Sequence, residues 1–97
     1  MINELVKTCH SIAKDKGFWE SSHNIPEKLM LIVTELSEAM EEYRKVDYDK
    51  NNFTEELADA IIRIFDLAGF MDLDLEGSVL KKIERNKNRP YLHGKTR

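Results

Sequence analysis

Two stretches, Glu35-Leu36-Ser37-Glu38 and Glu56-Leu57-Ala58-Asp59, share a pattern in which two acids stand three positions apart. Residues three apart lie on the same face of an α-helix, so each stretch presents two carboxylates side by side. Seventeen residues separate the two stretches, which is enough for a turn between two helices. If these helices run antiparallel, the acid pairs face each other, and four neighbouring carboxylates form a cation site.

The spacing of apolar residues around both stretches predicts helices. We expect four of them: residues 2–16, residues 26–44, a third containing residues 57–69, and a fourth from Asp72 or Asp74 to about Asn88. Gly17 ends the first helix, Asn24 caps the second, and Asn52 or Thr54 caps the third. Such a chain predicts an all-α fold, an antiparallel four-helix bundle.

Length and composition agree with this fold class. The chain has 97 residues, of which 34% are charged and 41% hydrophobic, with only four glycines and two prolines. This predicts one domain over residues 1–97, with residues 90–97 as an extended basic tail. Apolar residues cover more than half of the third helix, which in so short a chain predicts a partner subunit, and hence a homodimer or a dimer of dimers.

The charges are distributed unevenly along the chain. Residues 1–80 contain 8 Lys/Arg against 17 Asp/Glu, whereas residues 81–97 contain 7 against 1, so an acidic body carries a basic end. One cysteine, Cys9, excludes an internal disulfide. No apolar run is long enough to cross a membrane, and no signal peptide is visible, so we expect a cytoplasmic protein without a membrane partner.

The four acids allow two interpretations. They are either solvated acids on amphipathic helices, which a charge-rich chain produces by chance, or ligands of a hard cation such as Mg²⁺, with Mn²⁺ as a substitute. The dense Leu, Ala, Ile and Met around each pair favours the second interpretation. Because close carboxylates repel each other, such a group also needs a cation, protons or a basic partner, and Arg63, one turn past Asp59, is a candidate.

The chain resembles the MazG-like, all-α nucleoside triphosphate pyrophosphohydrolases. The two acid motifs and their spacer carry the resemblance, together with the segments 26–29, 34–39, 55–60 and 86–95. It spans roughly residues 18 to 95 and implies hydrolysis of a nucleoside triphosphate between its α and β phosphates. The products are a monophosphate and pyrophosphate, and the expected role is clean-up of the nucleotide pool.

The resemblance also implies roles for individual residues. Glu35, Glu38, Glu56 and Asp59 bind Mg²⁺, and Glu35 or Glu38 also orients or deprotonates the attacking water. Substrate contacts are expected from Trp19, which stacks on the base, and from Lys82, Asn86, Arg89 and Lys95 at the phosphates. Trp19 as a core or interface anchor, and the basic residues as a solvated face, remain the alternatives. Asp66 is either a further site acid or a salt-bridge partner of a neighbouring subunit.

A second function class is compatible with the same residues. In this alternative the chain is a non-catalytic helical interaction or nucleic-acid-binding module, whose basic C-terminal end contacts phosphates while the acids are structural. The acidic body and the short tail argue against a broad nucleic-acid footprint, so we do not expect nucleic acid as a partner.

Overall fold

The computed structural model, which describes residues 1–21 and 23–90, consists of four α-helices. They are α1 (Ile2–Asp15), α2 (Ile25–Tyr43), α3 (Lys50–Phe70) and α4 (Leu75–Lys87). The helices pack together, so the predicted all-α fold is confirmed. In the described part of the chain, no helix is both long and apolar enough to cross a membrane.

Local sequence signals account for three of the helix ends. Gly17 adopts a positive φ of 83° directly after α1, a conformation that costs glycine little and other residues more. Asn24 caps α2, since its side chain accepts a hydrogen bond from the Glu27 backbone N–H. Asp74 caps α4 in the same way through the Gly77 N–H. The first two ends are as predicted, and Asp74 is one of the two starts that the sequence allowed for α4.

The start of α3 was predicted wrongly. The cap is Asp49, whose side chain accepts hydrogen bonds from the backbone N–H groups of Asn51 and Asn52. The helix therefore begins at Lys50, ahead of the predicted caps Asn52 and Thr54. A contact from α2 holds the new cap in place, because the Asp49 N–H donates to Glu42 Oε2 at 3.0 Å.

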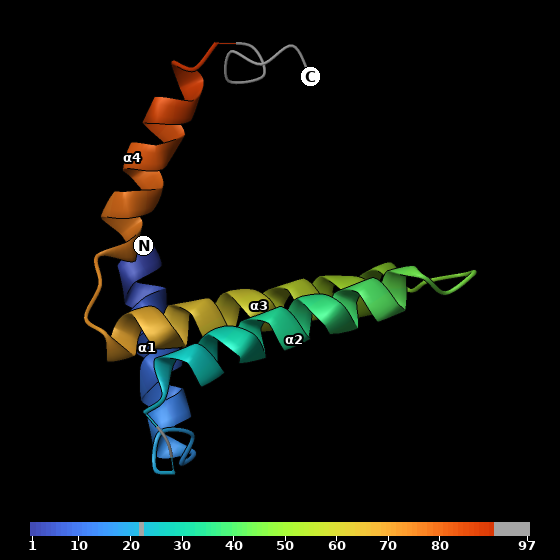
Figure 1. The fold of residues 1–97 in the computed structure, drawn as a ribbon, viewed down its shortest axis with the longest axis horizontal. Coiled ribbons are helices and arrows are strands. Elements are labelled where there is room, and N and C mark those ends of the chain that lie inside the picture. Colours follow the sequence, from blue (N-terminus) through green and yellow to red (C-terminus); the bar gives the residue numbers. More distant parts are fainter. Residues whose placement is uncertain (22, 91–97) are drawn as a thin grey trace.

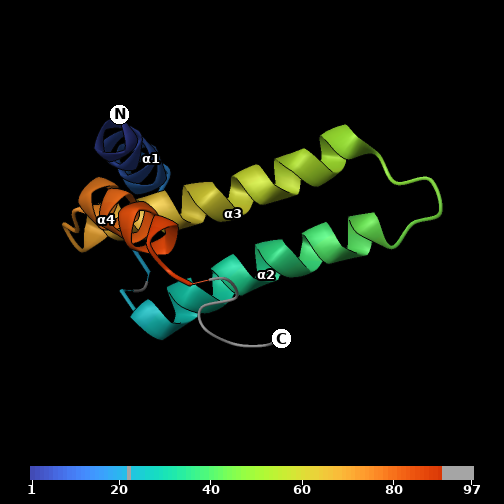
Figure 2. The same ribbon diagram turned by 90° about the horizontal axis from the view of Figure 1, so that it is seen from above.

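The helices form an angular arrangement. α2 and α3 lie side by side as an antiparallel hairpin, and α1 crosses α3 near the end of the hairpin opposite its tip (Figures 1 and 2). α4 leaves the same end and rises away from the hairpin, with its main packing against α1. The buried apolar residues come from α1, the loop after it, α2 and α3: Val6, Trp19, Ala39, Ala60, Leu67 and Ala68.

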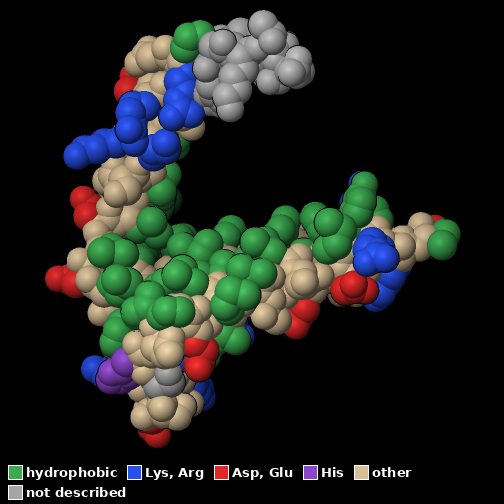
Figure 3. All heavy atoms as spheres, in the orientation of Figure 1, with side chains coloured by type: hydrophobic (Ala, Val, Ile, Leu, Met, Phe, Trp, Pro, Cys, Tyr) green, Lys and Arg blue, Asp and Glu red, His purple; other side chains and the backbone are tan. Residues whose placement is uncertain are grey.

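In a single protomer, most of the predicted apolar stripe of α2 is exposed to solvent. Val33, Leu36 and Met40 are 50%, 49% and 56% exposed, and Leu57 and Ile61 of α3 are also exposed. Hydrophobic side chains accordingly cover the face of the hairpin that looks toward α4 (Figure 3). The stripe that the sequence marks as core is thus only partly covered within the protomer.

Candidate metal centre

The hairpin brings both acid pairs together. Glu35 and Glu38 lie on α2, Glu56 and Asp59 lie on α3, and the antiparallel packing of these helices sets the pairs opposite each other. A side-chain hydrogen bond between Glu56 and Glu38 needs a proton on one of the two carboxyl groups, and this is the main reason that the pKa of Glu56 lies above its ordinary value. Burial and the charges of Glu38, Asp59 and Glu35 raise it further. The four acids therefore form one electrostatic group.

The environments of these four side chains differ. Glu35 is buried, Glu56 is half-buried, and Glu38 and Asp59 are exposed. Glu35 faces Arg63, whose Nε lies 3.5 Å from Glu35 Oε2. The predicted basic partner of the acid group is therefore present, and it contacts the most buried acid.

Two cavities flank the acid group. One, of about 250 Å³, includes Glu35, Asp59, Arg63 and Phe18 in its lining, so charged and apolar groups line it together. The other, of about 400 Å³, lies toward the tip of the hairpin and includes Glu38, Glu56 and further acids. A ligand in the first cavity would touch both acid pairs and a cation, as a phosphate compound held by a metal requires.

The donor set fits a hard divalent ion. Carboxylate oxygens are the ligands that Mg²⁺ prefers, and the ion usually keeps several waters and needs few protein ligands. The charges of Glu38, Asp59 and Glu35 contribute to the raised pKa of Glu56, and a cation among these acids would offset that part of the effect. Among the described residues, no group of three or more Asp, Glu, His or Cys side chains lies close enough together to hold a metal ion as the side chains stand. The four acids therefore match Mg²⁺ in their chemistry, and binding of an ion by three or more of them requires their side chains to move toward one another.

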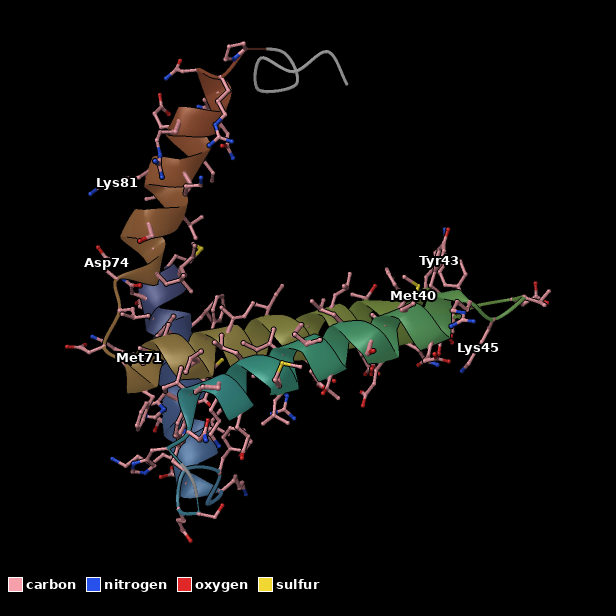
Figure 4. The ribbon with its side chains drawn as sticks, in the orientation of Figure 1. Met40, Tyr43, Lys45, Met71, Asp74 and Lys81 are labelled. Atoms are coloured by element: carbon pink, nitrogen blue, oxygen red, sulfur yellow. The ribbon has the colours of Figure 1, made fainter. Side chains whose placement is uncertain are left out.

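The predicted phosphate contacts lie elsewhere in the protomer. Lys82, Asn86 and Arg89 are exposed on or just past α4, which projects away from the hairpin, as the positions of Lys81 on α4 and Lys45 at the hairpin tip illustrate (Figure 4). Within one chain the structure does not bring these residues to the acids. Lys95 lies outside the described residues.

Trp19 lies in the core. Its ring stacks on Phe70 with centroids 3.9 Å apart and planes 5° from parallel, and its Nε1 donates to Asp66 Oδ1 at 2.9 Å. The side chain borders a different cavity, of about 290 Å³, together with His10 and His23. This environment agrees with the alternative that Trp19 is a core anchor. Stacking of Trp19 on a nucleotide base stays a prediction.

Asp66 connects α3 to α1 and to the loop after α1. The oxygen that accepts from Trp19 also lies 2.8 Å from His10 Nδ1, and Asp66 is only 4% exposed. As a carboxylate it can only accept, so the His10 tautomer with hydrogen on Nδ1 fits this contact. Both partners lie within the protomer, so Asp66 has a structural role that neither sequence alternative included. Asp66 also lines the 250 Å³ cavity with Glu35 and Asp59, so its role as a further site acid stays a prediction.

Sequence reasoning missed Lys28. Its side chain is buried, its Nζ donates to the Phe18 carbonyl oxygen at 3.2 Å, and it stands 3.9 Å from the centre of the Phe18 ring. Because Lys28 precedes Glu35 by seven residues, it lies on the same face of α2. This spacing was the sequence signal that could have indicated a position of Lys28 near the acid group. Lys28 fixes the loop residue that lines the cavity beside Glu35.

The chain was compared with known proteins by sequence and by fold. No protein-family model, no curated protein and no solved structure matches it.

Proposed function

We propose that the protein is an Mg²⁺-dependent nucleotide pyrophosphohydrolase of the MazG-like type, which cleaves nucleoside triphosphates to a monophosphate and pyrophosphate. One observation carries the proposal: the two acid pairs, 17 residues apart in sequence, meet across α2 and α3 and raise the pKa of Glu56. A cation bound among these carboxylates would reduce their mutual repulsion. The resemblance of the motifs supplies the choice of reaction.

The chain's own groups have distinct roles in this proposal. Glu35, Glu38, Glu56 and Asp59 hold the ion, and Glu35 or Glu38 orients or deprotonates the attacking water. When bound, Mg²⁺ neutralises phosphate charge and makes water a better nucleophile at neutral pH. Cations near the site stabilise the charge of the departing pyrophosphate. Such an enzyme acts on free nucleotides in the cytoplasm and removes unwanted or excess (d)NTPs.

Product analysis tests the reaction. After incubation with a panel of NTPs and dNTPs and Mg²⁺, ³¹P NMR should detect monophosphate and pyrophosphate in equal amounts. Glu38→Gln and Asp59→Asn should abolish turnover, whereas Glu4→Gln, which removes the same charge from an exposed position on α1, should retain it. Release of orthophosphate, or activity that survives both site substitutions, contradicts the proposal.

A second copy of the chain is part of the proposal. The exposed apolar face of the hairpin and the apolar residues Leu80 and Ile83 of α4, which are 58% and 48% exposed, need covering in water. Two hairpins that share this face form a homodimer, which can pair further into a dimer of dimers. Light scattering should give a multiple of the monomer mass, and Leu36→Asp should give monomer. Val46→Asp, at the 98% exposed hairpin tip, is the control and should leave the mass unchanged.

The second copy also offers a route for the phosphate contacts. Because α4 leaves its own hairpin, we propose that Lys82, Asn86 and Arg89 approach the acid group of the partner. Mixing Glu38→Gln chains with Arg89→Ala chains should then restore part of the activity, since one site in each mixed dimer carries neither substitution. No recovery after exchange of subunits contradicts contacts between subunits.

One observation favours the alternative of a nucleic-acid-binding module. The basic side chains of α4 are exposed on a helix that projects from the body. This alternative predicts binding to DNA or RNA that weakens steeply with salt, together with a thermal midpoint that Mg²⁺ leaves unchanged. The pyrophosphohydrolase proposal expects the reverse on both counts.

A further inference from the structure

Arg63 holds the position that a cation at Glu35 would need. Its Nε lies 3.5 Å from Glu35 Oε2, and the two side chains are 32% and 10% exposed. The guanidinium also stands over the Phe18 ring, with 5.4 Å from Cζ to the ring centroid. Arg63 follows Asp59 by one turn of α3, so it reaches the acid group from the same face as one of the proposed ligands.

No other described cation makes an ion pair with the four acids. The ion pairs of Lys45 and Arg44 are with Glu42 and Glu41. Lys28 lies on the face of α2 that carries Glu35, but its Nζ is engaged by the Phe18 carbonyl oxygen. Among the cations that the structure describes, Arg63 is therefore the one that offsets the charge of Glu35.

From these contacts we infer that Arg63 is a built-in competitor of the metal ion and sets the affinity of the site for it. This rests on the proposed function, because it takes Glu35 as a metal ligand. A divalent ion at Glu35 and the guanidinium repel each other and use the same carboxylate, so binding of the ion displaces Arg63. The released guanidinium remains beside the 250 Å³ cavity that it lines with Phe18 and Asp59.

The displaced side chain acquires a second role in this position. A guanidinium binds phosphate oxygens with paired hydrogen bonds, and the cavity is where a phosphate compound held by the ion would lie. Metal binding thus frees a phosphate ligand at the place where the substrate arrives. Without metal, Arg63 reduces the repulsion among the acids. With metal bound, it adds a positive charge for the phosphate groups of the substrate.

Metal binding to wild-type and Arg63→Gln protein tests the inference without substrate. Free Mn²⁺ is followed by electron paramagnetic resonance, and Mg²⁺ by calorimetry. Because the ion pair is only partly exposed, Arg63→Gln should bind the ion about three- to tenfold more tightly. Arg44→Gln is the matched control, since it removes the same charge from an exposed pair with Glu41 at 3.5 Å, and it should change the affinity by less than about twofold.

The outcomes separate this inference from the proposed function. Equal or weaker binding by Arg63→Gln overturns the role of Arg63 while the metal site stands, and binding by neither protein overturns both. Arg63→Lys keeps the charge and should stay near wild type. In EDTA, Arg63→Gln should melt below wild type, and Mg²⁺ should raise its midpoint by more than it raises that of wild type. An equal rise in both proteins also overturns the inference.

Discussion

Asp66 offers the sharpest test of how the core is held, because one of its oxygens serves two donors from different parts of the chain. Hydrogen bonds to a charged acceptor contribute about 1.5–3 kcal/mol each, and here the donors are Trp19 Nε1 at 2.9 Å and His10 Nδ1 at 2.8 Å. The substitution also removes the cost of burying the charged Asp66 carboxylate, which offsets part of the lost hydrogen-bond energy. We expect Asp66→Ala to lower the free energy of unfolding by about 2–4 kcal/mol.

Fluorescence-monitored urea denaturation measures this loss, since Trp19 is the only tryptophan. Protein concentration is held fixed so that association does not alter the comparison. For a chain of this length the loss corresponds to a midpoint lowered by roughly 10–25 °C in a thermal melt. Asp66→Asn retains a neutral acceptor and should lose about half as much.

A double-mutant cycle isolates the contact. Trp19→Phe removes the donor and keeps most of the ring, so the double variant Trp19→Phe/Asp66→Ala, followed by circular dichroism, should lose less than the sum of the two single losses. An Asp66→Ala protein within about 0.5 kcal/mol of wild type refutes the reasoning. Strict additivity in the cycle refutes it as well.

Two further predictions concern the titration of glutamates and the charge of the site. The pKa of Glu42 lies below its ordinary value of 4.5, chiefly because Glu42 accepts a hydrogen bond from the Asp49 N–H and then because it accepts one from Lys45. The ionised Glu42 therefore stabilises the folded protein fully above pH 4.5, the ordinary pKa, and this stabilisation is lost as the pH falls through the lowered pKa. Glu42→Gln should remove this part of the acid sensitivity in melts below pH 5, and an unchanged pH profile would contradict the contact. The pKa of Glu56 is raised, so its charged form opposes folding at neutral pH. Glu56→Gln should accordingly raise the melting midpoint in EDTA at pH 7 and reduce the gain from Mg²⁺, whereas a lower midpoint would argue against mutual repulsion of the acids.

The parts of the fold that depend on nearby residues were predictable from the sequence. Gly17 and Asn24 act through contacts within a few positions, so their effects on α1 and α2 could be read directly. The start of α3 could not, because Asp49, Asn52 and Thr54 are all acceptable caps. A contact between Asp49 and Glu42 accompanies the observed choice, and that contact forms only when the hairpin closes.

In the candidate site, too, the features that depend on nearby residues were predictable and those that depend on distant contacts were not. Helical spacing was enough to place the acids in two pairs, and the short connection was enough to set the pairs opposite each other. The environment of Trp19 depends on Asp66, 47 residues away, which no periodicity indicates. The direction of α4, and with it the separation of Arg89 from the acids, depends on packing against α1.

Anomalous diffraction from crystals soaked in Mn²⁺ tests the central claim most directly, because it locates the ion among competing carboxylates. We expect a peak between α2 and α3 with ligands from Glu35, Glu38, Glu56 and Asp59, and its loss in Asp59→Asn crystals. No peak at these residues would contradict the proposed site, and so would a peak held only by Glu41 and Glu55, which line the cavity at the hairpin tip beside Glu38 and Glu56.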